Sequence, residues 1–352
     1  MDYRKVIARI APLDEEAMKE SAKHWNSIVH PLHSLGKLED DTIRIAGMTK
    51  TPQIAFGKKA LVVMCADNGI VEEGVTQSGQ EVTAIVSENF LKEQATVAIM
   101  CKKAVVDIFP IDIGMASDTK VPRRKTAYGT KNFVREPAMA REECIRTIET
   151  GMEIAAELKE KGYGIVATGE MGIGNTTTAS AILSVLLSKP AEQVTGYGAG
   201  LTQEGLEKKI RVIKEGIDKW NPDPDDAIDV LAKVGGFDIA GLTGLMLGCA
   251  ANRLPVVLDG VISAAAALCA VTIAPQSRQY MVASHVSKEA AGGMALEALG
   301  LDAGLHLDMC LGEGTGAILY LEILDTAICI YHSMSTFEEV SIEQYEDYTG
   351  DR

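Results

Sequence analysis

Residues 58–66 narrow the choice of fold more than any other segment, because they form an apolar run, KKALVVMCA, with no polar residue after the two opening lysines. A strand with one face in water alternates apolar and polar side chains, whereas a strand buried on both faces is apolar throughout. The run ends at the polar turn Asp67-Asn68-Gly69. These features predict a strand inside a parallel sheet that is buried on both faces.

Strand and helix patterns alternate along the middle of the chain. Apolar spacing predicts a helix over 82–98 and another over 141–161, and apolar runs predict strands at 104–114 and 164–168. This alternation predicts an α/β fold with a doubly wound parallel sheet, in which ligands bind at the carboxyl ends of the strands.

Both ends of the chain have helical patterns. Residues 1–46 carry spaced apolar positions that are interrupted at Pro31, and residues 317–330 form an apolar segment that we expect to be a helix. The acidic tail, residues 335–352, is expected to be a terminal helix with a frayed end.

The formal net charge of −15 argues against a nucleic-acid partner, because nucleic-acid phosphates would be repelled. A small phosphorylated ligand is compatible with this charge, since local N–H groups and one or two lysines can outweigh a screened global charge. Such a ligand needs a local anion site.

The seven cysteines are scattered without a C-x-x-C pair, and none of the six histidines stands at metal-ligand spacing. We therefore expect reduced thiols, no disulfide and no metal site. The N-terminus has no signal-peptide pattern, and no apolar stretch approaches the length of a membrane span. The expected location is the cytoplasm, with no membrane partner.

A glycine loop, Gly169-Glu170-Met171-Gly172-Ile173-Gly174-Asn175-Thr176, leads from the strand at 164–168 into a helix over 179–187. A strand, a glycine loop and a helix N-terminus together form an anion site of the kind that binds phosphate. Asn175 stands where a P-loop has lysine, and the order G-x-x-G-x-G differs from the dinucleotide fingerprint, so a monophosphate is the expected ligand. The alternative is a glycine turn that only packs the helix against the sheet.

Further stretches carry candidate ligand groups. A second glycine loop contains Gly198 and is followed by Lys208 and Lys209, which are either a cation for the phosphate or solvated surface lysines. Asp238 and Asp259 follow apolar segments in short turns. Each acid is a candidate for holding ribose hydroxyls, and the alternative for each is a cap on the following helix.

One carboxylate stands among glycines in Leu311-Gly312-Glu313-Gly314-Thr315-Gly316. Glycines on both sides of Glu313 let backbone N–H groups and a ligand approach closely, because no Cβ excludes them. His285 and Ser287 lie just ahead of this loop in the chain. The alternative interpretation is a glycine-rich connector with a solvated glutamate.

Several of these motifs occur together in one family. The loops at 169–177, 235–240, 258–260 and 311–316, in this order, resemble those of the nicotinate-nucleotide:dimethylbenzimidazole phosphoribosyltransferase family, which makes the lower-ligand nucleotide of cobamides. The resemblance starts at Ser34-Leu35-Gly36-Lys37-Leu38-Glu39 and covers most of the chain.

The resemblance implies a Rossmann-like parallel sheet with a small helical domain built from both termini. The implied division is residues 1–46 plus 317–352 for the small domain and 47–316 for the large α/β domain. It also implies a dimer, expected to be a homodimer, with a heterodimer with a paralogue as the alternative. The implied reaction transfers phosphoribose from nicotinate mononucleotide to an aromatic base and needs neither a metal nor a cofactor.

The resemblance also assigns roles to residues. Glu313 matches the general base of the family, and Glu170 lies beside the phosphate loop in a supporting catalytic role. Gln80 is expected to line the base pocket. By the same resemblance, Gly172, Gly198, Lys209 and Ser287 would hold the mononucleotide. The motifs themselves add further expected substrate-binding residues, which are Gly174, Asn175 and Thr176 of the phosphate loop, the candidate ribose ligand Asp259, and Gly312 and Gly314 beside Glu313.

The chain departs from the family pattern at Asn68, Tyr197 and Val286, where histidine, arginine and an arginine before serine are usual. These changes leave the acceptor open between dimethylbenzimidazole and a phenol or p-cresol. A second alternative is a non-catalytic partner subunit of a paralogue. A nicotinamide-dependent oxidoreductase would need the dinucleotide fingerprint that the chain lacks.

Overall fold

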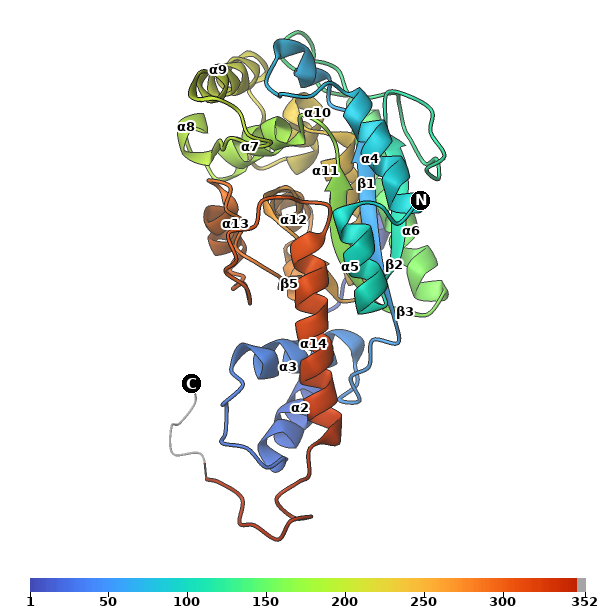
Figure 1. Cartoon of the computed structure of the whole chain (residues 1–352), viewed down its shortest axis with the longest axis vertical. Coiled ribbons are helices and arrows are strands. Elements are labelled where there is room, and N and C mark those ends of the chain that lie inside the picture. The colour runs from blue at the N-terminus through green and yellow to red at the C-terminus, as the bar shows by residue number, and fades with distance from the viewer. Residues whose placement is uncertain (347–352) are drawn as a thin grey trace.

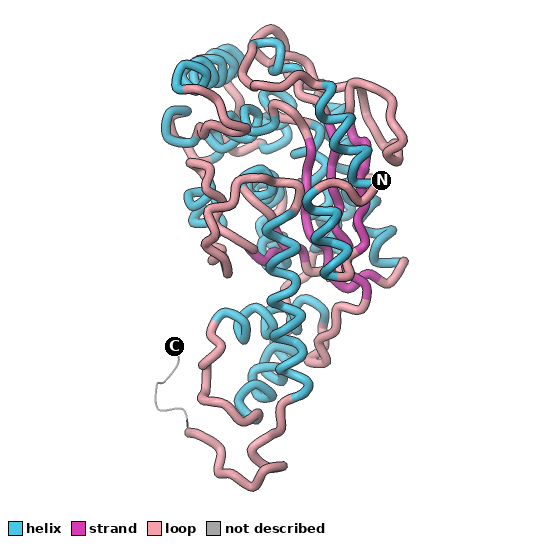
Figure 2. Tube along the Cα trace, viewed as in Figure 1, coloured by secondary structure: helices cyan, strands magenta, loops and turns pink. Residues whose placement is uncertain are grey.

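The computed structural model describes residues 1–346 and has one five-stranded sheet. The strands are β1 (Lys58–Ala66), β2 (Asp107–Gly114), β3 (Tyr163–Met171), β4 (Val256–Leu258) and β5 (Met281–Ala283). They lie in the order β2-β1-β3-β4-β5, and every neighbouring pair is parallel. The predicted parallel α/β sheet is therefore confirmed, and Figure 2 shows it between helices.

The structure has helices on both faces of the sheet and below it (Figure 1). They are α1 (Tyr3–Ile7), α2 (Glu15–Ser27), α3 (Lys37–Thr49), the 3₁₀ helix η1 (Gly69–Glu73), α4 (Glu81–Leu91), α5 (Thr96–Ala104), α6 (Arg141–Glu160), α7 (Asn175–Leu186), α8 (Ala191–Val194), α9 (Gln203–Trp220), α10 (Ala227–Val234), α11 (Phe237–Ala251), α12 (Val261–Ile273), the 3₁₀ helix η2 (Pro275–Tyr280), α13 (Gly292–Leu299) and α14 (Thr315–Ser333). Within residues 1–346, none of these helices combines the length and apolar character that crossing a membrane requires.

The two faces of β1 belong to different cores. Val62 and Met64 lie in a core with α6, α11 and α12, whereas Leu61 and Val63 lie in a core with α5 and α14. Successive side chains of a strand point to opposite faces, so a strand between two helix layers needs apolar residues at every position. This requirement explains the unbroken apolar run of β1.

The single helix predicted over 82–98 is wrong. The structure has two helices, α4 and α5, separated at residues 92–95. Buried positions such as Thr83, Phe90 and Val97 keep helical spacing across the break, so apolar periodicity alone does not reveal it. The break lies in the polar run 92–94, where Glu93 adopts a left-handed backbone with φ of 56°.

The predicted terminal helix is also wrong as far as residue 346. Residues 335–346 form turns and extended segments, with a single antiparallel bridge between Ile28 and Thr336. Phe337 is buried, but Val340, Ile342 and Tyr345 are exposed, so a helix here would have little apolar surface to bury. The rest of the predicted helix, residues 347–352, lies outside the described residues.

Helices α2 and α3 lie below the sheet together with the far end of α14 (Figure 1). Trp25 of α2 donates a hydrogen bond to Thr42 of α3 at 2.8 Å, and Tyr320 of α14 donates one to Asp41 of α3 at 2.6 Å. Segments from both ends of the chain therefore pack together. The division into domains at 46/47 and 316/317 stays a prediction, and α3 continues through the first of these positions.

Candidate active site

A cavity of about 290 Å³ lies at the carboxyl ends of β3 and β4. It is lined by segments 75–78, 170–176, 197–199, 259–263 and 310–313, together with Val86, Leu201, His285, Ser287 and Glu289. The chain leaves β1 toward β2 on one side and continues from β3 toward β4 on the other, so the sheet changes direction between β1 and β3. Open α/β sheets bind ligands at such a point. The cavity reaches it, because its lining includes residues 75–78, which follow β1, as well as 170–176 at the end of β3.

The predicted phosphate loop forms one wall of the cavity. β3 ends at Met171 and α7 starts at Asn175, with Gly174 in between at φ of 92°. A Cβ on Gly172 would lie 2.4 Å from the carbonyl oxygen of Ala66, so only glycine fits where the phosphate loop touches the end of β1. The N-terminus of α7 therefore faces the cavity, which Asn175 and Thr176 line.

A buried cation stands behind this wall. The Nζ of Lys209 donates hydrogen bonds to Thr176 Oγ1 at 2.8 Å and to the carbonyl of Gly196 at 3.2 Å. Burial lowers the pKa of Lys209 to about 8, and the nearby Glu289 carboxylate acts in the opposite direction. Thr176 and Gly198 line the cavity directly. Lys209 is therefore a buried cation, and the alternative of a solvated surface lysine is wrong for it.

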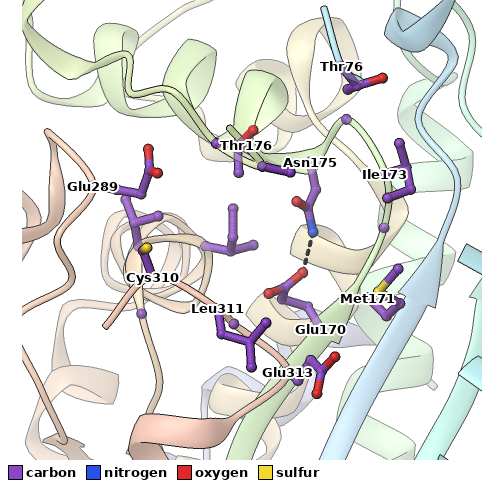
Figure 3. A pocket seen from close by; sticks show the side chains of 18 of the residues that line it. Thr76, Glu170, Met171, Ile173, Asn175, Thr176, Glu289, Cys310, Leu311 and Glu313 are labelled. Atoms are coloured by element: carbon purple, nitrogen blue, oxygen red, sulfur yellow. Dashed lines mark hydrogen bonds between the residues drawn. The ribbon is translucent and has the colours of Figure 1, made fainter. Parts of the chain in front are cut away.

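Two buried acids share one amide at the centre of the site. The Nδ2 of Asn175 donates a hydrogen bond to Glu170 (Figure 3). It donates another, at 3.1 Å, to Asp238. Burial and then the charge of Asp238 raise the pKa of Glu170 to about 8. Burial likewise raises the pKa of Asp238 to about 6. Glu170 therefore carries a proton at neutral pH.

Glu313 projects from three successive left-handed residues. The φ angles of Gly312, Glu313 and Gly314 are 85°, 62° and 101°. The Oε2 of Glu313 accepts a hydrogen bond at 3.3 Å from the backbone N–H of Val97, in the first turn of α5. Burial raises the pKa of Glu313, whereas this N–H lowers it. Figure 3 shows Glu170 turned toward Asn175 and the Glu313 carboxyl turned away from it.

Close packing fixes the backbone at Glu313. A Cβ on Gly169 of β3 would lie 2.3 Å from the carbonyl oxygen of Glu313, and one on Gly312 would lie 2.3 Å from Glu170 Oε1. The glycines of both motifs therefore let the Glu313 loop approach β3 and the Glu170 carboxyl.

Asp259 contacts this loop as well. Its carboxylate accepts hydrogen bonds from three backbone N–H groups at the start of α14, those of Gly314, Gly316 and Ala317. The sequence suggested a cap on the following helix as the alternative role of Asp259. The helix that it caps in the structure is α14, not α12, which follows it directly in the chain.

Ten of the thirteen predicted site residues line the cavity, and three do not. The ten are Glu170, Gly172, Gly174, Asn175, Thr176, Gly198, Asp259, Ser287, Gly312 and Glu313. Lys209 lies behind Thr176, and Gly314 faces Asp259. Gln80 instead donates a hydrogen bond to the carbonyl of Asn68 at 3.1 Å, in the turn after β1.

The segment 75–78, which closes one side of the cavity, was not predicted from the sequence. Its Gln77 donates a hydrogen bond to the carbonyl of Gly200, so this segment contacts the second glycine loop. Cys310 and Glu289 were also missed. These residues share no spacing or composition that marks a site, and only the fold brings them together. Among the described residues, no three His, Cys, Asp or Glu side chains are placed to hold a metal ion.

Residues 10–342 match a family model described as phosphoribosyltransferase. The chain is 47% identical over 349 residues to nicotinate-nucleotide–dimethylbenzimidazole phosphoribosyltransferase of Ruminiclostridium cellulolyticum, an alignment that covers 98% of this chain and 99% of the relative. The enzyme of the same name from Alkaliphilus metalliredigens is 45% identical, with 96% and 98% covered. Among solved structures, CobT from Thermus thermophilus superposes with a TM-score of 0.89 at 35% identity, covering 94% of this chain and all of that one.

Proposed function

Because this chain belongs to the phosphoribosyltransferase family and is an enzyme of the nicotinate-nucleotide–dimethylbenzimidazole phosphoribosyltransferase type, we propose that it transfers phosphoribose from nicotinate mononucleotide to 5,6-dimethylbenzimidazole or a related aromatic base. The products are the α-riboside phosphate of the base and free nicotinate. They would serve assembly of the nucleotide loop of a cobamide.

The observation that carries this proposal is that one cavity connects an anion site with a half-buried carboxylate. The anion site consists of the N-terminus of α7, Thr176 and the buried Lys209 behind it. Glu313 lies in the wall at residues 310–313. A phosphoribosyl donor needs the first group for its 5′-phosphate, and an N–H acceptor needs the second as a base.

The chemistry requires one proton transfer and one substitution. The Glu313 carboxylate takes the N–H proton of the acceptor ring, and the other ring nitrogen forms a bond to the anomeric carbon. The bond between that carbon and nicotinate breaks, and its electron pair returns to the pyridine nitrogen. Attack from the face opposite nicotinate inverts the anomeric carbon and gives the α-riboside.

The environment of Glu313 suits a general base. Burial raises its pKa above the ordinary value of 4.5, so the carboxylate binds a proton more tightly than it would in water. The N–H of Val97 stabilises the charged form and so opposes the effect of burial. Glu170, protonated at neutral pH, places no second full charge beside it.

A phenol or p-cresol is the second candidate acceptor, because it presents one O–H to the same carboxylate. The departures at Asn68 and Tyr197 favour keeping this alternative, since both lie near the cavity. Asn68 is buried with an unpartnered Oδ1, and Tyr197 lines the cavity itself. A non-catalytic partner subunit is a further alternative, although a scaffold would have no use for the buried Lys209 and Glu170.

We propose a homodimer, which light scattering after gel filtration would test.

The test is an assay by chromatography. Purified protein is incubated with nicotinate mononucleotide and, separately, dimethylbenzimidazole, adenine, phenol or p-cresol, and nicotinate and riboside phosphate are measured. We expect an azole riboside with the wild type. Glu313→Gln should lower kcat by about 10²- to 10⁴-fold, the usual contribution of a general base, with a similar KM for nicotinate mononucleotide.

The other outcomes separate the alternatives. Product with phenols only would assign the chain to phenol activation while keeping Glu313 as the base. An active Glu313→Gln variant would remove Glu313 from that role. Absence of product with every acceptor would favour the partner-subunit alternative.

A further inference from the structure

The loop that carries Glu313 has a backbone that must be held in place. Glu313 is a non-glycine residue in the left-handed region, with left-handed glycines on both sides. A non-glycine residue in this region is strained and persists only where its surroundings fix it. Because catalysis by a base depends on the position of its carboxylate, whatever fixes this loop also affects the reaction.

Asp259 is the main polar contact of the loop on the side of β4. Its Oδ2 accepts a hydrogen bond from the N–H of Gly314 at 3.0 Å, and its Oδ1 accepts two, from Gly316 at 2.8 Å and Ala317 at 3.2 Å. Asp259 is itself buried, with 4% of its surface exposed. Hydrogen bonds from backbone N–H groups to a buried carboxylate are among the stronger kind in proteins.

The sheet anchors Asp259 in turn. It directly follows Leu258, the last residue of β4, and its own N–H donates a hydrogen bond to Thr168 Oγ1 of β3 at 3.1 Å. On the side of β3, the Glu170 carboxyl packs against the loop, since a Cβ on Gly312 would lie 2.3 Å from its Oε1. The Glu313 loop is therefore held between two buried carboxyl groups from neighbouring strands.

We infer that Asp259 is a positioning residue, which holds the Glu313 loop in its catalytic conformation, and that it is not a ligand of the substrate ribose. A carboxylate has about four lone-pair sites, and backbone N–H groups occupy three of them here. The Nδ1 of His285 lies 3.9 Å from Oδ1. Little accepting capacity remains for a ribose hydroxyl. That Glu313, the residue held in place, is the general base rests on the proposed function.

The two roles predict different kinetics. Asp259→Asn keeps the size of the side chain but turns an amide N–H₂ toward backbone N–H groups, so at least one hydrogen bond to the loop is lost. A positioning role predicts that kcat falls about 100-fold, the effect of a displacement of roughly 1 Å, while KM for nicotinate mononucleotide changes by less than about 3-fold. A ribose ligand predicts a KM increase of about 10-fold or more with a smaller change in kcat.

Asp226→Asn is the matched control. Asp226 also accepts two backbone hydrogen bonds at a helix N-terminus, from Ile228 at 3.0 Å and Asp229 at 3.1 Å in α10. It caps a helix whose residues do not line the cavity. We expect kcat and KM of this variant to equal those of the wild type.

Hydrogen exchange measures the loop without relying on activity. In Asp259→Asn, the amides at 312–317 should exchange at least 10-fold faster than in the wild type. In Asp226→Asn, only the start of α10 and the start of α6, whose Arg141 pairs with Asp226 at 2.8 Å, should change. Unchanged exchange at 312–317 would overturn the inference. If the wild type transferred phosphoribose to no acceptor, the proposed function would fail, and exchange would still decide whether Asp259 holds the loop.

The pH profile adds a readout that a purely structural role would not shift. Glu170, His285 and Glu313 are the titratable groups that face Asp259. The charge of Asp259 raises the pKa of Glu313, so removing that charge should move the acid limb of the pH profile of kcat to lower pH.

If Asp259→Asn does not fold, Asp259→Ser, which keeps one acceptor oxygen, is measured in the same way. A KM effect alone in either variant would assign Asp259 to the ribose.

Discussion

Glu170 lies among other acids, and this environment decides its protonation. Both Asp238 and Asp259 raise its pKa, in addition to the larger effect of burial, and the resulting value is about 8. The amide of Asn175 and the N–H of Glu313 favour the charged form without reversing the shift. Glu170 therefore acts as a neutral hydrogen-bonding group near neutral pH and gains a negative charge only in mild alkali.

This shift predicts a pH-dependent stability. Between the ordinary pKa of 4.5 and the folded value of about 8, the folded protein keeps a proton on Glu170 that the unfolded chain has lost. Stability from this group is therefore complete below pH 4.5 and falls as pH rises through the window, by up to about 1.4 kcal/mol per pH unit. Glu170→Gln is always neutral and should show a flatter dependence in denaturant unfolding at pH 5, 6, 7 and 8.

Asp238→Asn serves as the comparison for this prediction. The pKa of Asp238 is about 6, so its own contribution should disappear mainly between pH 4 and 6. Equal slopes for the wild type and Glu170→Gln between pH 6 and 8 would contradict the assignment of a proton to Glu170.

At the scale of elements, the sequence predicted what depends on local patterns and missed what depends on tertiary contacts. The strand at 58–66 was predictable because burial on both faces demands an unbroken apolar run. The break between α4 and α5 was not, because the buried positions keep helical spacing across it. This break creates the helix N-terminus that binds the Glu313 carboxylate through Val97.

The same distinction applies to the site. The glycine loops at 169–174 and 312–316 were found because glycine is needed where backbones touch. The partners of Asp259 could not be predicted, because they lie 55 to 58 residues away in the chain and are backbone groups. Every residue except proline carries a backbone N–H, so residue types do not show which of these groups will bind Asp259.

The end of α5 provides a prediction about stability. Val105 caps this helix with φ of 53° and ψ of 55°, and 80% of its surface is exposed. A left-handed conformation costs a β-branched residue roughly 1–2 kcal/mol, and glycine avoids that cost but loses more entropy on folding. Val105→Gly should therefore raise stability by up to about 1 kcal/mol, or about 2 °C in the midpoint of thermal unfolding.

Ile99→Gly is the matched control, because Ile99 is also β-branched and exposed but lies inside α5. Glycine inside a helix costs about 1 kcal/mol, so this variant should be less stable than the wild type. If both variants were destabilised equally, the backbone at Val105 would not be strained as the structure indicates.

At the scale of the whole molecule, α14 connects the Glu313 loop with the terminal helices α2 and α3 (Figure 1). Its first residues receive the cap of Asp259, and the helix continues to Ser333, among the terminal helices (Figure 1). Tyr320, in the second turn of α14, is a buried link to the terminal helices, because its hydroxyl donates a hydrogen bond to Asp41 of α3. Burial and the charge of Asp41 raise the pKa of Tyr320, so this hydroxyl keeps its proton.

Tyr320→Phe tests whether the terminal helices control the active site or only support it. The variant keeps the ring but removes a hydrogen bond to a charged group, which typically contributes about 1.5–3 kcal/mol. Asp41 still has Lys37 and Arg44 as partners, so the loss should lie near the lower value. We expect a lower midpoint of thermal unfolding with kcat unchanged at 25 °C, because Asp259 and Glu170 hold the Glu313 loop locally.

Tyr331→Phe completes this experiment. Tyr331 lies on the same helix, but its hydroxyl donates to the neutral carbonyl of Pro52 at 3.0 Å, so its removal should cost only about 0.5–1.5 kcal/mol. The thermal midpoint of Tyr320→Phe should therefore be the lower of the two. A clear fall in kcat for Tyr320→Phe well below its unfolding temperature would mean that loss of the contact between α14 and α3 reaches Glu313 along the first turns of α14. The contacts of Asp259 and Glu170 with the loop would then not suffice to hold Glu313 in place.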